Sequence, residues 1–333
     1  MGSERPSGDP TGTHLPRAPG RGSQDSRRGL PRIGYLGPEG TFSEEALLSG
    51  TAPGSVQHVP RASIYETVVA LRDGNLEGAV VPIENSLDGS ITVTLDLLAD
   101  EAGEIQIVGE TLLTVRHSLI ASRALELSEI TTVLTHPQVP GQCARFLRGE
   151  LAHAQVLPAS STAEAVREVV EDARPGRAAL GTRLAAEIYG GTLLREGVQD
   201  RDDNETRFVW LARHGDGEGA PTSPVAPPGA RDGNGDNARH GKDERRWKTS
   251  LVFWGPGAER PGWLVRCLDE FARREINLTK IESRPRRERL GHYMFFVDLV
   301  GGVETERSVS EAVAGVGEMC EEVRVLGSYP SAS

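Results

Sequence analysis

The stretch "RIGYLGPEGTFSEEALLS" (Arg32 to Ser49) sets the pattern on which most of this 333-residue chain is built. Its first six residues form an apolar run typical of a buried strand, and a Gly-Pro turn separates them from a helical pattern. Thr41 and Glu44 have the spacing of a capping box, which predicts that a helix begins there. A strand followed at once by a helix is the unit from which α/β folds are assembled.

The same alternation continues along the chain. "GAVVPIEN" (78–85) reads as a second strand, and "TTVLTHP", "AQVLPAS" and "AALGT" read as further strands followed by helical stretches. This rhythm predicts an α/β architecture with mostly parallel sheets. Two such series flank residues 111–120, so we expect two lobes with a cleft between them.

Two segments have compositions that do not favour a packed core. Residues 1–31 are rich in Pro, Gly, Ser and Arg and lack the apolar stretch of a secretory signal, and residues 214–246 are dense in Gly, Pro and Asp. We therefore expect a disordered N-terminal tail (1–31), a bilobal body (32–213), a disordered linker (214–247) and a C-terminal domain (248–330).

The C-terminal domain has a different order of elements. Between residues 249 and 326 the patterns read strand, helix, strand, strand, helix, strand. This βαββαβ order predicts an α+β ferredoxin-like sandwich, with both helices on one face of an antiparallel sheet.

Composition excludes several classes of function. Lys and Arg number 37 against 48 Asp and Glu, a net charge of −11, and no basic stripe is present, so we expect no nucleic-acid partner. No apolar run is long enough to span a bilayer, and we expect no membrane partner. Three distant cysteines and eight scattered histidines form no disulfide framework or metal motif. We therefore expect a cytoplasmic protein without metal or cofactor.

Polar residues gather where the predicted strands of the body end, which is where α/β folds bind ligands. Thr41 and Ser43 open a helix, whose free N–H groups and partial positive charge suit an anion; simple helix capping is the alternative. Ser160, Ser161 and Thr162 stand at another helix start and are expected to cap it, and His136 is expected to be a turn residue.

A second polar group follows the strand 78–85. Glu84, Asn85 and Ser86 stand together at its end, and Gly89 lets a ligand approach the backbone; a capped loop is the alternative interpretation.

Thr206 and Arg207 stand between an acidic loop and the strand-forming run "FVWL". Thr206 alone is an ordinary β-branched residue for the start of a strand, and Arg207 alone could neutralise the loop.

Four motifs together resemble a known family. "YLGPEGTFSEEAL", "VPIENSLDGSITVTLDLL" and "DDNETRF" resemble monofunctional prephenate dehydratases, and "RPGWLVRCLDEFA" with "NLTKIESRP" resembles the ACT domain that regulates them. The resemblance implies loss of CO2 and water from prephenate to give phenylpyruvate, in the biosynthesis of phenylalanine. It also implies a catalytic body like that of periplasmic binding proteins.

The resemblance also implies roles for single residues. The essential threonine of the family falls on Thr206, followed by Arg207 and Phe208. Thr206 would donate a hydrogen bond to the departing hydroxyl. Arg207 would either hold a substrate carboxylate or pair with the acidic loop. The substrate-binding residues expected beside them are Phe208, Thr41, Ser43, Glu84, Asn85, Ser86 and Gly89.

In the C-terminal domain the resemblance implies a site for L-phenylalanine, enclosed by two subunits of a dimer or tetramer. Its expected residues are Gly262, Leu264, Val265, Asn277, Glu282, Ser283, Arg284 and Pro285. Trp263 departs from the small residue usual in the family, and its indole would either crowd this site or point outward. Two alternatives remain open at this stage, an arogenate dehydratase of the same fold and a non-catalytic amino-acid sensor.

Overall fold

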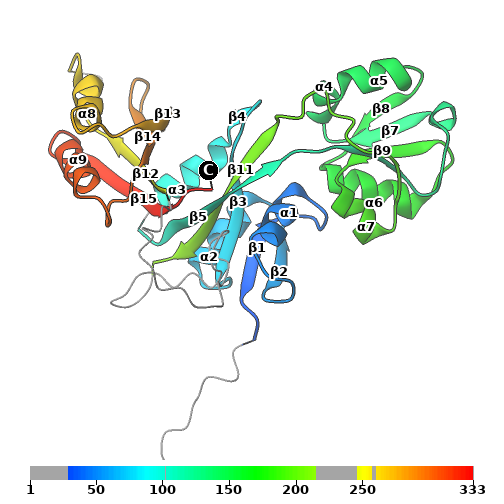
Figure 1. Cartoon of the computed structure of the whole chain (residues 1–333), viewed down its shortest axis with the longest axis horizontal. Coiled ribbons are helices and arrows are strands. Elements are labelled where there is room, and N and C mark those ends of the chain that lie inside the picture. Colours follow the sequence, from blue (N-terminus) through cyan, green and yellow to red (C-terminus); the bar gives the residue numbers. More distant parts are fainter. Residues whose placement is uncertain (1–28, 102, 215–245, 257–259, 333) are drawn as a thin grey trace, which may run out of the picture. The chain divides into compact units, whose positions relative to one another are not determined.

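The computed structural model describes residues 29–101, 103–214, 246–256 and 260–332, so the expected N-terminal tail and linker lie almost wholly outside the described residues. Among the residues described, no helix combines the length and hydropathy that a membrane span requires. The chain forms two α/β lobes and a C-terminal sandwich (Figure 1).

Lobe 1 is built on a six-stranded sheet in the order β2-β1-β3-β11-β5, with the short strand β4 beside β3. Its elements are β1 (Arg32–Leu36), α1 (Phe42–Ser49), β2 (Gln57–Arg61), α2 (Ile64–Arg72), β3 (Gly78–Asn85), β4 (Gly89–Ser90), α3 (Thr92–Asp100), β5 (Ile105–Thr114) and β11 (Glu205–Arg213).

Lobe 2 is built on a five-stranded sheet in the order β10-β6-β9-β7-β8. Its elements are β6 (Ser118–Ala121), the 3-10 helix η1 (Leu127–Glu129), β7 (Thr132–Thr135), α4 (Val139–Gln142), α5 (Ala144–Glu150), β8 (Gln155–Pro158), α6 (Thr162–Asp172), β9 (Arg177–Gly181), α7 (Arg183–Tyr189) and β10 (Thr192–Arg195). The two-lobe organisation expected from the sequence is confirmed.

The sheets are mixed rather than mostly parallel. β1 is parallel to β2 and β3, and β7 is parallel to β8 and β9, as the strand–helix alternation predicts. β11 is antiparallel to both β3 and β5 because it returns from lobe 2 and re-enters the sheet beside the strand that left it. The ends of β5 and β11 therefore lead into the two connections between the lobes (Figure 1).

The C-terminal sandwich has the predicted βαββαβ order. Its elements are β12 (Trp247–Trp254), α8 (Trp263–Ala272), β13 (Leu278–Pro285), β14 (Tyr293–Val300), α9 (Arg307–Gly317) and β15 (Glu322–Pro330). The strands are all antiparallel in the order β13-β14-β12-β15, which is the ferredoxin-like arrangement.

The two faces of the sandwich sheet have different partners. One face packs against α8 and α9 through Leu251, Phe253 and Val297. The other face has no helix of its own and packs on lobe 1, sharing a core with Ile105, Ile107, Val209 and Leu211. Val252, Trp254, Met294, Phe296, Leu326 and Tyr329 form the sandwich side of that shared core.

Gly327 shows how closely the sandwich sheet approaches lobe 1. A Cβ atom added at Gly327 of β15 would lie 2.1 Å from the backbone oxygen of Ile107 on β5. Gly327 and Ile107 lie on strands that are each hydrogen-bonded within their own sheet, so neither backbone can move aside without shifting a whole sheet. Only glycine fits this contact.

We predict that Gly327→Ala lowers the free energy of unfolding by about 1–3 kcal/mol, because the added methyl group overpacks the sheet–sheet contact. Urea unfolding followed by circular dichroism measures the change. Gly317→Ala on α9 is the matched control, since a Cβ there meets nothing within 4 Å, and it should keep or slightly raise stability. Equal stability of the two variants would contradict the close packing at Gly327.

Candidate active site

A cavity of about 330 Å³ lies where the two lobes meet. Its walls come from both lobes and from both connections between them. Lobe 1 contributes Leu36, Thr41, Phe42, Ser43, Pro82, Asn85, Asp88, Ile91, Thr206 and Phe208, lobe 2 contributes His136, Gln138, Val139, Gln142, Ser160, Ser161 and Thr162, and the connections contribute Val115, His117 and Asn204. Five of the sequence-predicted site residues of the body therefore come together here, together with the three hydroxyl residues of lobe 2.

Thr206 reaches the cavity because of its place on β11. Side chains alternate between the two faces of a strand, so Thr206 and Phe208 share one face and Arg207 takes the other. Thr206 and Phe208 line the cavity, and Thr206 pairs in register with Asn85 at the end of β3.

Asn85 fixes the direction of the Thr206 hydroxyl. The Oδ1 atom of Asn85 accepts hydrogen bonds from the backbone N–H groups of Leu87 (2.9 Å) and Asp88 (3.0 Å). Its Nδ2 atom must therefore face the other way, and it donates to Thr206 Oγ1 at 2.9 Å and to Asn204 Oδ1 at 2.8 Å. Thr206 is thus an acceptor toward Asn85, and its own hydrogen is left for a partner in the cavity.

Thr41 and Ser43 stand at the start of α1, buried and lining the cavity. Thr41 occupies the N-cap position, but the predicted capping box does not form. The Thr41 hydroxyl donates instead to Leu36 O (2.8 Å), and the Glu44 carboxylate accepts from the backbone N–H of Gly40 (2.6 Å). The tight turn after β1 brings both of those backbone groups within reach.

The electrostatics of the cavity come from helix ends rather than from basic side chains. The N-termini of α1 and of the 11-residue helix α6 both border it, and Ser161 caps α6 by accepting from Glu164 N at 3.0 Å, as expected. No Lys or Arg is among the described residues that line the cavity. Helix N-termini carry partial positive charge and free N–H groups, so the cavity suits an anion.

His117 and Gln142 are cavity residues that the sequence did not single out. His117 is only 1% exposed, and its Nε2 atom lies 2.9 Å from Gln142 Oε1. The Gln142 amide donates to Asp88 Oδ2 at 3.3 Å, so its oxygen faces His117 and His117 Nε2 carries the hydrogen. Burial lowers the pKa of His117, and Nδ1 has no hydrogen-bond partner among the described residues. In the sequence, only the position of His117 between the two predicted lobes could have indicated that it lies at the cavity.

Three predicted residues beside Asn85 do not line the cavity. The Ser86 hydroxyl accepts from Glu205 N (3.0 Å) and so holds the loop that leads to Thr206. Gly89 has φ +82° in β4, and Glu84 lies 3.1 Å from Lys280 Nζ of the sandwich. The expectation that these residues contact a substrate does not agree with their positions, because Glu84 faces away from the cleft and Ser86 and Gly89 serve the adjoining turn.

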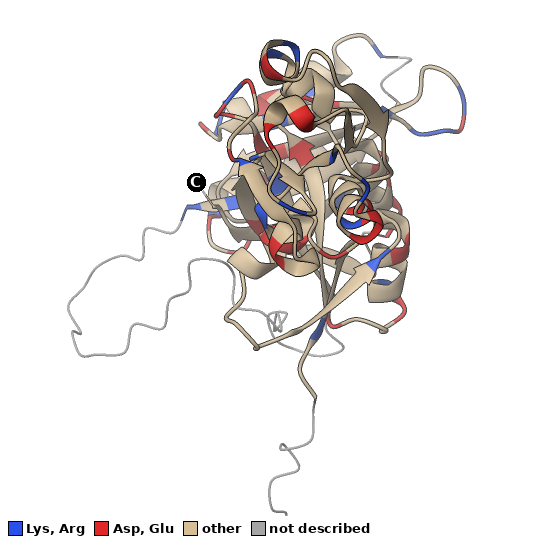
Figure 2. Ribbon diagram, turned by 90° about the vertical axis from the view of Figure 1, so that its right-hand side faces the viewer, with Lys and Arg blue, Asp and Glu red and all other residues tan. Residues whose placement is uncertain are grey.

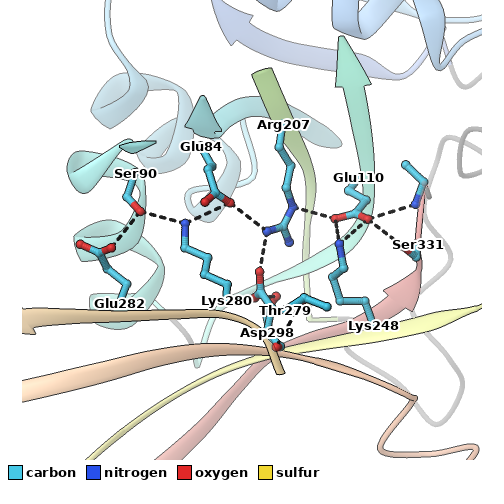
Figure 3. A network of polar contacts seen from close by, with 12 residues as sticks. Glu84, Ser90, Glu110, Arg207, Lys248, Thr279, Lys280, Glu282, Asp298 and Ser331 are labelled. Atoms are coloured by element: carbon cyan, nitrogen blue, oxygen red, sulfur yellow. Dashed lines mark hydrogen bonds and ion pairs between the residues drawn. The ribbon is translucent and has the colours of Figure 1, made fainter. Parts of the chain in front are cut away.

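Arg207 also points away from the cavity, so neither interpretation of Arg207 agrees with the structure. Its guanidinium is buried between lobe 1 and the sandwich, where Nε donates to Glu110 Oε2 (2.7 Å) and Nη1 to Asp298 (Figure 3). Its Nη2 donates to Tyr329 Oη (2.7 Å). It therefore neither reaches a substrate carboxylate nor pairs with the acidic loop. The alternation of side chains along β11 is the reason.

A second cavity, of about 370 Å³, lies in the sandwich at the start of α8. Gly262, Leu264 and Val265, three of the residues expected at the L-phenylalanine site, line it together with Trp263 and Phe295. The indole of Trp263 neither points outward to solvent nor fills the cavity. Its Nε1 donates to Met319 O (2.7 Å), and its ring packs against Phe253 and Phe295 in the sandwich core.

The other residues predicted for this second site lie elsewhere in the chain. Glu282 and Arg284 face lobe 1, where Glu282 accepts from Ser90 Oγ (3.2 Å) and Arg284 pairs with Asp96 (2.8 Å). These two expectations do not agree with the structure, since alternate residues of β13 point to opposite sides. Asn277, Ser283 and Pro285 are exposed and do not line the cavity within one chain.

A family model described as "Prephenate dehydratase" matches residues 33–216. A relative named prephenate dehydratase from Mycobacterium tuberculosis (strain ATCC 25618 / H37Rv) is 38% identical over 310 residues, which cover 91% of this chain and 88% of the relative.

Two solved structures have the same fold over most of the chain, each with a TM-score of 0.74. One is a prephenate dehydratase in complex with L-Phe from Arthrobacter aurescens, 34% identical, covering 90% of both chains. The other is GqqA, described as a novel type of quorum-quenching acylase, 26% identical, covering 90% of this chain and 98% of that one. By the match of the family model and the identity to named relatives, the chain belongs to the prephenate dehydratase family.

Proposed function

We propose that the chain converts prephenate to phenylpyruvate, CO2 and water in the cavity between the two lobes. Family membership supports the reaction, and one observation supports its location. Thr206, the threonine of the Thr-Arg-Phe motif, lies in the cavity, where its oxygen accepts from Asn85 and its own hydrogen has no acceptor among the residues that the structure describes.

The chemistry requires help for a poor leaving group. When the ring carboxylate leaves as CO2, its bonding electrons enter the ring and expel the hydroxyl group on the opposite carbon, and the ring becomes aromatic. Negative charge develops on the departing oxygen. A hydrogen bond from Thr206 stabilises that charge, and a well-placed donor of this kind contributes roughly 10²–10³ in rate. A threonine hydroxyl is too weak an acid to transfer its proton early, so its main role is to donate a hydrogen bond, and the departing hydroxide takes up a proton from the solvent to become water.

The substrate is a dianion, and the cavity offers it hydroxyl groups and helix ends. We propose that the start of α1 binds one carboxylate through the Ser43 hydroxyl and the backbone N–H groups beside Thr41, whose own hydroxyl donates to Leu36 O, while the start of α6 at Ser160 and Ser161 binds the other from lobe 2. Phe208 and Phe42 give the ring an apolar surface. Ser86 acts on Thr206 only through the loop that it holds.

We predict that Thr206→Val lowers kcat for prephenate by at least 10²-fold, because the variant keeps the shape of the side chain and loses the donor. Steady-state assays that follow phenylpyruvate absorbance measure kcat and KM. Thr192→Val on β10 of lobe 2, outside the cavity, is the matched control and should keep full turnover. Near-normal turnover of Thr206→Val would remove the hydroxyl from the mechanism.

We predict that Asn85→Asp lowers kcat by at least tenfold while KM changes less. A carboxylate cannot donate to Thr206 Oγ1, and it would attract the hydrogen that the departing oxygen needs. Asn75→Asp is the control, since Asn75 is exposed after α2 and does not line the cavity. If Asn85→Asp turned over prephenate like the control, the direction of the Asn85–Thr206 hydrogen bond would be unimportant.

We further propose that the sandwich is an ACT-type domain that binds L-phenylalanine and inhibits the enzyme. Its βαββαβ fold supports this, as does the cavity at Gly262, Leu264 and Val265, whose apolar and aromatic lining suits a benzyl side chain. The 34% identical relative from Arthrobacter aurescens was solved in complex with L-Phe.

Assembly of the chain into a dimer or tetramer would complete this site. β13 is an edge strand among the described residues, and Ile281, Ser283 and Pro285 are exposed along it. An edge strand with exposed apolar residues is a surface that a second copy can cover. Ser283 and Pro285 of one copy would then lie beside the cavity of the other.

We predict that Val265→Asp raises the phenylalanine concentration needed for half-inhibition by at least tenfold and leaves uninhibited turnover unchanged. Val265 is 69% exposed at the start of α8, so the substitution places a charge in the cavity without disturbing the core. Val300→Asp, at an exposed valine outside the cavity, is the matched control and should keep normal inhibition. Unchanged inhibition of Val265→Asp would place the effector elsewhere.

The competing activities are separated by one set of assays with purified protein. Prephenate, arogenate and an acylated amine, the class of substrate implied by the acylase relative, are supplied in turn. We expect turnover of prephenate. No observation in the cavity favours the other two substrates, and a non-catalytic sensor would turn over none. We place this biosynthetic activity in the cytoplasm.

A further inference from the structure

A buried group of charged and polar side chains joins the sandwich to lobe 1 directly behind Thr206. We call it the interface cluster: Glu110, Arg207, Lys248, Asp298 and Tyr329. Figure 3 labels the four charged members. The side chain of Glu110 is fully buried, and those of Arg207, Asp298 and Lys248 are 9%, 7% and 12% exposed. Two positive and two negative charges balance, and each has a partner of opposite sign.

Arg207 uses every nitrogen of its guanidinium in this cluster. Nε donates to Glu110 of β5, Nη1 to Asp298 of β14 and Nη2 to Tyr329 of β15. Two of these three partners belong to the sandwich. Their own positions are fixed by Ser250, which contacts both Asp298 and Tyr329. A planar guanidinium with three hydrogen-bond acceptors around it has a single orientation, and the ammonium group of a lysine cannot make the same three bonds.

The backbone of β11 carries this orientation to the cleft. Arg207 follows Thr206 directly, with its side chain on the opposite face, so a shift of Arg207 moves Thr206 as well. The neighbouring strand β3 has the same arrangement. Asn85 faces the cavity, while Glu84 lies 3.1 Å from Lys280 of the sandwich and 3.6 Å from Arg207 Nη1.

The ladder between β11 and β3 is irregular at this point. Thr206 pairs with Asn85 and Arg207 with Glu84, but the register shifts before Phe208, which pairs with Pro82. A bulge interrupts the backbone hydrogen bonds and re-aims the side chains beside it. The pairing with β5 is regular here, so it is on the β3 side, where Asn85 lies, that side-chain contacts add to the positioning of Thr206.

We infer that Arg207 is a positioning residue, through which the C-terminal sandwich holds Thr206 and Asn85 in their catalytic arrangement. This inference rests on the proposed function of Thr206. It gives the arginine of the Thr-Arg-Phe motif a role that involves no contact with substrate, and it gives the sandwich a direct route to the donor hydroxyl.

The test uses the full-length chain with Arg207→Lys, Tyr329→Phe and a matched control. Arg324→Lys is the control, because Arg324 also joins the sandwich to lobe 1, by donating to Ala99 O, but contacts no member of the cluster. We expect Arg207→Lys to lower kcat at least tenfold and Tyr329→Phe about threefold, with KM for prephenate changed less than twofold. Arg324→Lys should keep kcat. In the double variant Arg207→Lys/Tyr329→Phe, kcat should fall by less than the product of the two single fold-losses. Both substitutions remove the same Arg207–Tyr329 hydrogen bond.

Hydrogen exchange of the peptide that covers residues 205–213 gives a readout independent of activity. Exchange should be at least tenfold faster in Arg207→Lys than in Arg324→Lys. If prephenate is not turned over by any of the proteins, the proposed function fails while the exchange result still reports on β11. Unchanged kcat in Arg207→Lys, or equal loss of kcat in the arginine variant and the control, would overturn the inference. If Arg207→Lys does not fold, normal kcat in Tyr329→Phe overturns it alone.

Discussion

The two faces of strand β11 have different surroundings, and the two lobes and the sandwich are arranged around this strand. It closes the lobe 1 sheet between β3 and β5, and its first residues come directly from the connection with lobe 2. One face presents Thr206 and Phe208 to the cleft, and the other buries Arg207 and Val209 toward the sandwich. Lobe 1, lobe 2 and the sandwich therefore all meet at one strand.

The charges behind this strand need a physical explanation, because burial of ions is costly. Removing a carboxylate or guanidinium from water costs several kcal/mol each, and close pairing only offsets this when the hydrogen bonds are complete. The cluster meets that condition. Burial alone would raise the pKa of Glu110, but Arg207 and Lys248 outweigh it and hold the pKa below its ordinary value.

The cluster fixes an orientation, and its net contribution to stability is small, because apolar residues of similar size often fill such a space at comparable free energy. Glu110, Asp298 and Tyr329 contact the guanidinium of Arg207 from three strands, so the guanidinium fits one arrangement of the two sheets. Acidic (red) and basic (blue) positions occur on strands as well as on helices and loops (Figure 2).

The sequence predicted those features that depend on local patterns. The two lobes, the βαββαβ order and the cavity positions of Thr41, Ser43 and Asn85 follow from periodicity and from motifs at strand ends, and the position of Thr206 follows from the family resemblance. Glu84, Arg207, Glu282 and Arg284 were misplaced for one reason. A sequence motif identifies the neighbours of a residue along the chain. It does not show to which face of a sheet the side chain points, because that depends on which other elements pack against the strand.

Features that depend on contacts between residues distant in the sequence could not be predicted from local patterns. The antiparallel return of β11 required knowing that a strand revisits lobe 1 after 90 residues of lobe 2. His117 escaped notice because nothing adjacent to it in sequence explains its burial, which comes from Gln142 and Phe42.

The shared core between lobe 1 and the sandwich has a consequence for synthesis of the chain. Lobe 1 leaves the ribosome before β12 has been made, so Ile107, Val209 and Leu211 and the buried carboxylate of Glu110 face water at that stage. An apolar sheet face without its cover attracts other chains. The nascent protein is thus most prone to aggregate, and most dependent on chaperones, in the interval before its last 80 or so residues fold onto it.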